Sequence, residues 1–254
     1  MLRFVEVKGK DSEDFLQRVT AGTVKGIGVG EGRAGLLLNG QSRMLAQFEL
    51  LRTERERYLL AAPEGCASAL ADALEALHFS ENLEIGLLGL KAGVLKAEKR
   101  REEQGSFPFQ KTGDGYVWPA PVPGFAFSTF TAETPADWEF ARIGALVPWP
   151  AQDWDANTPA LEAGMLPWID RDKGCYPGQE VVELSLNVGH PARVLVAVET
   201  NQQLQAGEKT PWDGTEAIVT SAAFANGKTR ALLRLPWGKK DSLPTGFTRI
   251  RSHW

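Results

Sequence analysis

The chain has 254 residues, 43% of them hydrophobic and 24% charged, so it is long enough to bury a sizeable core and to hold two or three small domains. No apolar run approaches the ~20 residues of a membrane-spanning helix, and the N-terminus lacks the apolar core of a signal peptide, which together predict a cytoplasmic protein without a membrane partner. A net charge of −4 with scattered lysines and arginines argues against direct binding of nucleic acid.

The N-terminal residues predict a short helix followed by a meander of strands. A helix from Asp11 or Ser12 to about Gly22 would place three apolar side chains on one face, those of Phe15, Leu16 and Val19. Apolar runs separated by turn signals then predict strands at Leu36–Leu38, Met44–Leu51 and Tyr58–Ala62. The spacing Gly-x-Gly-x-x-Gly occurs at residues 30–35, but a strand follows it where a phosphate site needs a helix, so we interpret it as a glycine-rich turn.

The next segment predicts a small β-α-β unit of the split ferredoxin type. Its helix, Glu64–Leu77, carries Cys66 on an apolar stripe, where the cysteine acts as a small core hydrophobe. Strands are expected at Leu83–Leu90 and Ala92–Ala97. The run Lys99–Glu103 mixes charges of both signs, which predicts a solvated face.

The second half of the chain predicts one more helix and then a barrel. The helix begins near Pro135 and ends by Gly144. From Arg193 onward, short β-rich runs alternate with turn signals, as in a small antiparallel barrel. We therefore expect an α+β protein with a main domain of residues 1–50 and 91–188, a ferredoxin-like insert of residues 51–90, and a C-terminal β-barrel of residues 189–254.

Functional groups are densest in residues 172–180, where a thiol, an ammonium, a phenol, an amide and a carboxylate lie around two glycines. Gly174 and Gly178 can adopt backbone angles that a Cβ forbids, and Pro177 fixes its own φ, so the segment predicts a shaped loop. A plainer interpretation is a tight connection with one small buried cysteine, Cys175. Soft metal ligands are few, with two cysteines and three histidines in the chain, so a zinc or iron–sulfur site held by this chain alone is not expected.

The sequence Lys-Gly-Cys-Tyr-Pro-Gly-Gln-Glu at residues 173–180 resembles the Lys-Gly-Cys-Tyr-x-Gly-Gln-Glu signature of the YgfZ family, and the resemblance covers most of the chain. Members of that family are folate-binding relatives of the glycine-cleavage T-protein, an aminomethyltransferase. They are implicated in making or maintaining iron–sulfur proteins and, through them, in tRNA thiolation. The resemblance implies a T-protein-like arrangement that binds tetrahydrofolate or a derivative in an interdomain cavity beside this loop. The cofactor-binding residues that it implies are Glu162, Tyr176, Gln179 and Glu180.

The segment Thr158–Met165 is similar to the Leu-Glu-Ala-Gly-Met segment of T-proteins. In that superfamily the glutamate, here Glu162, accepts hydrogen bonds from the pterin ring. A carboxylate suits this role because the ring N–H and the exocyclic amine are two donors side by side. Without the resemblance, Glu162 is an acid in the first turn of a helix capped at Thr158.

The sequence departs from the family pattern at two places that affect the expected catalytic and charged residues. Residues 38–47 resemble its Leu-Asn-x-x-Gly-Arg-x-Leu-Ala-Asp segment, which carries the catalytic aspartate of T-protein, but this chain has Ala46-Gln47 there. An amide cannot accept a proton as a carboxylate does, so aminomethyl transfer by the T-protein mechanism is not expected. Glu183 and Val188 also stand where arginines are frequent in the family.

Three functions are consistent with these residues. The first is a YgfZ-like folate-binding protein that supports iron–sulfur cluster assembly or repair, with Cys175 and Lys173 as candidate catalytic residues. Lys173 would then stabilise the Cys175 thiolate, whereas an inert packing cysteine is the alternative. The second is a folate-dependent one-carbon transferase or demethylase. The third is a folate-free adaptor whose acidic surface contacts iron–sulfur assembly or client proteins.

Overall fold

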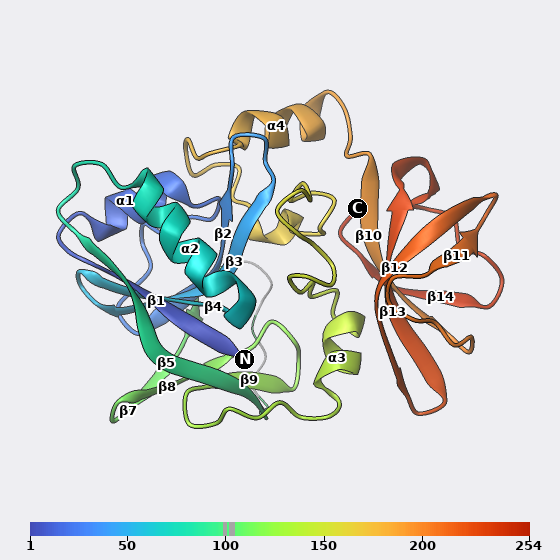
Figure 1. The fold of residues 1–254 in the computed structure, drawn as a ribbon, viewed down its shortest axis with the longest axis horizontal. Coiled ribbons are helices and arrows are strands. Elements are labelled where there is room, and N and C mark those ends of the chain that lie inside the picture. Colours follow the sequence, from blue (N-terminus) through green and yellow to red (C-terminus); the bar gives the residue numbers. More distant parts are fainter. Residues whose placement is uncertain (99–100, 102–104) are drawn as a thin grey trace.

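The computed structural model of the chain describes residues 1–98, 101 and 105–254 (Figure 1). Within them, a nine-stranded sheet has the order β6-β2-β3-β4-β1-β5-β9-β8-β7, and every adjacent pair in it is antiparallel. Its strands are β1 (Leu2–Lys8), β2 (Glu31–Leu38), β3 (Met44–Glu54), β4 (Arg57–Pro63), β5 (Glu84–Lys96), β6 (Phe107–Pro108), β7 (Gln110–Thr112), β8 (Gly115–Pro119) and β9 (Phe125–Ser128). No helix in the described ranges is both long enough and apolar enough to span a membrane.

Two helices cover one face of this sheet. They are α1 (Ser12–Val19) and α2 (Glu64–Leu77), and both were predicted from their apolar spacing. Phe15 and Leu16 of α1 and Leu70 and Leu74 of α2 are buried in one core with side chains of β1 to β4. Cys66 lies in this same core, as expected.

The opposite face of the sheet encloses a second core rich in aromatic side chains. The sheet curls so that β8 and β9 approach β1, and the rings of Phe4 and Trp118 meet edge to face at 5.9 Å. Strand β6 at one end also contacts β8 near the other end. The sheet is therefore nearly closed around this core, and aromatic residues that could have walled a ligand are used for packing.

The expected insert of residues 51–90 is not a separate unit. Strands β4 and β5 both pair with β1, and β3 crosses the predicted boundary at residue 50 without a break. The two strands predicted around Ala92 form one continuous strand, β5, which crosses the other boundary. Hydrogen-bonded ladders thus join this segment to the main sheet, although its local elements have the predicted types.

The C-terminal residues form a five-stranded sheet of order β11-β12-β13-β10-β14. Its edge strands approach each other around a core, where the rings of Trp212 and Phe247 lie 5.1 Å apart. Helix α3 (Trp138–Gly144) lies between the two sheets in Figure 1 and buries Ile143 against Leu195 and Leu232. The strands are β10 (Arg193–Thr200), β11 (Lys209–Trp212), β12 (Thr215–Ala225), β13 (Lys228–Pro236) and β14 (Phe247–Ser252).

Candidate functional site

Glu162 lies in a series of turns, not in the helix that its position after Thr158 suggested. Ala163 N donates to Pro159 O at 3.0 Å, and Gly164 then takes a φ of +76°, which stops any helix from continuing. The neighbours Leu161 and Ala163 are buried in the core, whereas Glu162 is half-buried. It lines a hollow of about 320 Å³ with Arg234 and residues of the loop from Ala151 to Pro159, and we call this space the Glu162 hollow.

Arg234, in β13, is the cation of the Glu162 hollow. Burial lowers the pKa of its guanidinium, and the negative charge of Glu162 is the largest influence that opposes this lowering. Arg234 Nη2 donates to the backbone oxygen of Asp153, while its buried Nε has no hydrogen-bond partner among the described residues. The hollow thus combines a carboxylate with a guanidinium that is hydrogen-bonded at one end.

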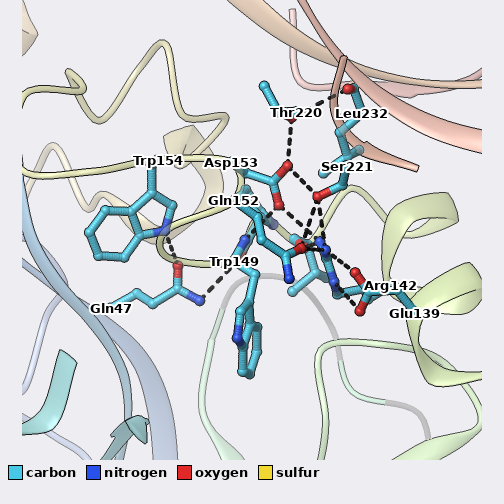
Figure 2. A network of polar contacts seen from close by, with 12 residues as sticks. Gln47, Glu139, Arg142, Trp149, Gln152, Asp153, Trp154, Thr220, Ser221 and Leu232 are labelled. Atoms are coloured by element: carbon cyan, nitrogen blue, oxygen red, sulfur yellow. Dashed lines mark hydrogen bonds and ion pairs between the residues drawn. The ribbon is translucent and has the colours of Figure 1, made fainter. Parts of the chain in front are cut away.

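A buried polar network holds the wall of the hollow in place (Figure 2). Asp153 is fully buried, and its carboxylate accepts from Arg142 Nη1 at 2.9 Å and from Trp149 N at 2.8 Å. Its other oxygen accepts from the hydroxyls of Thr220 at 2.6 Å and Ser221 at 2.7 Å, both on β12. Because a buried charge is stable only when paired and hydrogen-bonded, this network fixes the loop against the C-terminal sheet.

Gln47, where the sequence resemblance expects the T-protein aspartate, joins two parts of the fold through its side-chain amide. Its Oε1 accepts from Trp154 Nε1 at 2.7 Å, and its Nε2 donates to Pro148 O at 3.1 Å (Figure 2). The side chain is buried, and both ends of its amide are engaged. The site therefore provides no carboxylate that could take a proton at this point of β3.

Beside Gln47, Glu49 forms a buried ion pair that the sequence did not reveal. Arg101 Nη2 donates to Glu49 Oε1 at 2.9 Å, and both side chains are only 4% exposed. The expected solvated face at residues 99–103 is therefore wrong for Arg101, whose guanidinium also lies over the Phe107 ring; residues 99, 100, 102 and 103 lie outside the described residues. The hollows that Glu49 and Arg101 line have volumes of about 10 and 30 Å³, far below the ~300 Å³ of a typical ligand pocket.

Lys173 fastens the signature loop to α1. Its Nζ donates to the backbone oxygens of Gln17 and Thr20 at the C-terminal end of that helix, and Gln17 Nε2 donates back to Lys173 O at 3.0 Å. Burial lowers the pKa of Lys173 to about 8. Because the ammonium donates to carbonyls of α1 and not to Cys175, the arrangement favours a positioning role for Lys173 over stabilisation of a thiolate.

Gly178 joins the loop to helix α4 (Gln179–Asn187) and packs tightly against the turn before β3. Its φ is +83°, and a Cβ placed on it would lie 2.5 Å from Asn39 O and 2.8 Å from Ser42 Cα. Only glycine combines a positive φ with the absence of a Cβ that would collide with these backbone atoms. Helix α4 then buries Val182 in the main core, while Glu183 on the same helix pairs with Arg171 at 2.6 Å.

The other side chains of the signature differ in exposure. Cys175 is exposed, contrary to a packing role, whereas burial raises the pKa of the Cys66 thiol to about 11. Tyr176 is buried beneath Lys173 Nζ, which lies 5.4 Å from its ring centre, and its hydroxyl has no partner in the described part of the chain. Gln179 is half-buried and Glu180 is exposed.

The structure divides the predicted site residues into two groups. Glu162 lines its hollow without any of residues 173–180. Asp170, Arg171 and Asp172, immediately before the signature, line a different hollow of about 270 Å³ together with Arg33. The described residues contain no group of three or more histidine, cysteine or acidic side chains placed to hold a metal ion.

Comparisons with known proteins identify a similar fold but no matching family or curated protein. No protein-family model matches the chain, and no curated protein matches it either. The crystal structure of glycine cleavage system aminomethyltransferase T from Bartonella henselae is similar to it, with a TM-score of 0.76 and 18% sequence identity over 99% of this chain and 83% of that chain. Over 99% of its length, the chain thus has a fold like that of aminomethyltransferase T.

Proposed function

We propose that the chain is a folate-binding protein of the YgfZ type, which binds tetrahydrofolate or a derivative and supports iron–sulfur cluster assembly or repair and, indirectly, tRNA thiolation. The observation that carries the proposal is the presence of Glu162 and Arg234 in the lining of one hollow, within a chain that resembles aminomethyltransferase T over almost its whole length. The signature at residues 173–180 supports the more specific assignment.

The Glu162 hollow fits a pterin by size and by chemistry. Its volume of about 320 Å³ lies in the range of small-molecule sites. Glu162 offers two acceptor oxygens for the ring N–H and the 2-amino group of a pterin, and Arg234 offers a donor for an acceptor on the same ring. Bound tetrahydrofolate would supply a carrier for one-carbon groups.

The chain's own residues limit what such a site does. Gln47 provides no base, which disfavours a folate-dependent transferase that works by the T-protein mechanism. Tyr176, Gln179 and Glu180 do not line the Glu162 hollow, so we assign their loop to presenting Cys175. In the proposal, iron–sulfur assembly or client proteins meet the molecule at this exposed thiol.

Two measurements separate the parts of this proposal. Tetrahydrofolate at about 100 times its Kd should stabilise the wild type by about 2.7 kcal/mol in thermal unfolding and leave Glu162→Ala unaffected. In cells that lack the chain, thiolated tRNA and the activity of iron–sulfur enzymes should fall, and the wild type should restore them while Cys175→Ser does not. Unchanged levels in those cells would remove the iron–sulfur role and leave folate binding standing.

A further inference from the structure

One end of the Arg234 guanidinium is fixed by a hydrogen bond, and the side chain lines the Glu162 hollow. Nη2 donates to Asp153 O, and Asp153 is itself anchored by Arg142 and by two hydroxyls of β12. The buried Nε has no partner among the described residues. A planar guanidinium tied at one end presents its remaining N–H groups in a fixed direction, which suits recognition of a single acceptor.

Two other carboxylates act on Arg234, those of Asp153 and Asp155, and both accept hydrogen bonds from other groups of the protein. Asp155 Oδ1 is already taken by the Thr158 hydroxyl at 2.8 Å and by Asn157 N at 2.9 Å. Glu162 shares the hollow with Arg234, and the two influence each other electrostatically. A ligand therefore meets acceptors at Glu162 and a cationic donor at Arg234.

We infer that Arg234 determines specificity for the 4-oxo group of the pterin ring, an inference that rests on the proposed folate site. In a pterin, the 2-amino group, N3–H and the 4-oxygen follow one another along one edge. When the first two donate to Glu162, the 4-oxygen lies beside them and accepts from Arg234. A 4-amino analogue has two N–H donors at that position and no N3–H, so it faces Arg234 donor to donor and leaves buried polar groups unpaired.

The analogue is also repelled by charge. A 2,4-diaminopteridine takes up a proton more readily than a pterin, and its cation would lie next to the guanidinium of Arg234. The hollow thus both favours the 4-oxo ring and disfavours the 4-amino ring.

The test compares tetrahydrofolate with its 4-amino analogue, tetrahydroaminopterin, by calorimetric titration in reducing buffer. The wild type should bind tetrahydrofolate at least about 10-fold more tightly than the analogue, since a hydrogen bond to a charged donor contributes about that factor or more. Arg234→Met should lose about 10-fold or more for tetrahydrofolate and none for the analogue. Arg234→Lys keeps a cationic donor and should retain the preference in part.

Arg55→Met is the matched control, because Arg55 is exposed, does not line the hollow and is not among the charges that act on Arg234. It should bind both ligands as the wild type does, and melting temperatures of all variants report whether they fold. Equal losses of both ligands in Arg234→Met, or unchanged tetrahydrofolate binding, would overturn the inference while leaving the folate site intact. Absence of tetrahydrofolate binding to the wild type would overturn both.

Discussion

Gln47 Oε1 accepts a hydrogen bond of 2.7 Å from the indole Nε1 of Trp154, which lies 107 residues further along the chain. The same amide donates to Pro148 O, so one buried side chain joins β3 to the loop that forms the Glu162 hollow and to the chain just before that loop. A donor and an acceptor are both required at this point. An aspartate or glutamate there would offer acceptors only.

Gln47→Glu should therefore destabilise the fold. A carboxylate would face Pro148 O without a proton to donate, which costs about 1–3 kcal/mol for a buried unsatisfied group. Urea unfolding at neutral pH measures the change, and Gln41→Glu is the control, because Gln41 is exposed and should change stability by less than about 0.5 kcal/mol. Equal unfolding free energies of the two variants would contradict a stabilising role for the two hydrogen bonds of Gln47.

The two glycines of the signature should differ in their tolerance of alanine. Gly174 and Gly178 both have positive φ, so both variants pay the same backbone strain. Only at Gly178 does the added Cβ collide with backbone atoms, those of Asn39 and Ser42. We expect Gly178→Ala to cost about 1–3 kcal/mol more than Gly174→Ala in urea unfolding, as for overpacking elsewhere. Similar costs would contradict the packing of this loop on the turn before β3.

The two cysteines should differ in reactivity. A thiol reagent at neutral pH should label Cys175 at least about 10²-fold faster than Cys66, because Cys175 is exposed while burial both shields Cys66 and raises its pKa to about 11. Mass spectrometry of the labelled peptides gives both rates. Adding urea should bring the two rates together. Slow, equal labelling of the folded chain would show that the Cys175 thiol is not accessible.

Lys173 gives stability a distinctive pH dependence. Its pKa is lowered to about 8 by burial in the folded chain but lies near the ordinary 10.5 in the unfolded chain. Between these pH values the unfolded state binds more protons, so the contribution of Lys173 to stability rises with pH. The difference in unfolding free energy between the wild type and Lys173→Met should shift in favour of the wild type from ~pH 7.5 to ~pH 9.5.

A shift of that free-energy difference in favour of Lys173→Met as the pH rises would contradict the lowered pKa of Lys173. It would show that the carbonyls of Gln17 and Thr20 stabilise the ammonium by more than burial opposes it. Asp170 is the carboxylate coupled to Lys173, and because its pKa is lowered from the ordinary carboxyl range it stays ionised throughout this pH window and adds no slope to the difference.

Local patterns predicted α1, α2 and α3, but they gave no range for α4, suggested a helix after Thr158 that the structure replaces with turns, and left the pairing of the strands open. The apolar spacing of residues 64–77 gave α2 with its observed ends, because its stripe must face the core. Strand partners do not follow from such patterns. The pairing of β1 with both β4 and β5 depends on contacts between residues 49 or more positions apart (57 − 8 for Lys8 and Arg57), and it merges the predicted insert into the main sheet.

The candidate site was predictable only in part, for a similar reason. The glutamate of residues 158–165 was found from its resemblance to T-proteins, but Arg234, which lines the same hollow, follows 72 positions later (234 − 162) in a β-rich run that carries no ligand-binding motif. The buried pairs Glu49–Arg101 and Arg142–Asp153 were missed because a charged residue in a sequence is usually solvated. The exposure of Cys175 depends on how Lys173 and Gly178 fasten its loop.

Calorimetric titration of tetrahydrofolate into the wild type, Glu162→Ala and the surface control Glu216→Ala, in reducing buffer, tests the central claim most directly. Glu216 is exposed on β12 and lies outside the Glu162 hollow. Binding of one equivalent by the wild type and the control, with loss of binding in Glu162→Ala, is the predicted result. Absence of binding to the wild type, or undiminished binding to Glu162→Ala, would contradict the assignment of the Glu162 hollow as a folate site.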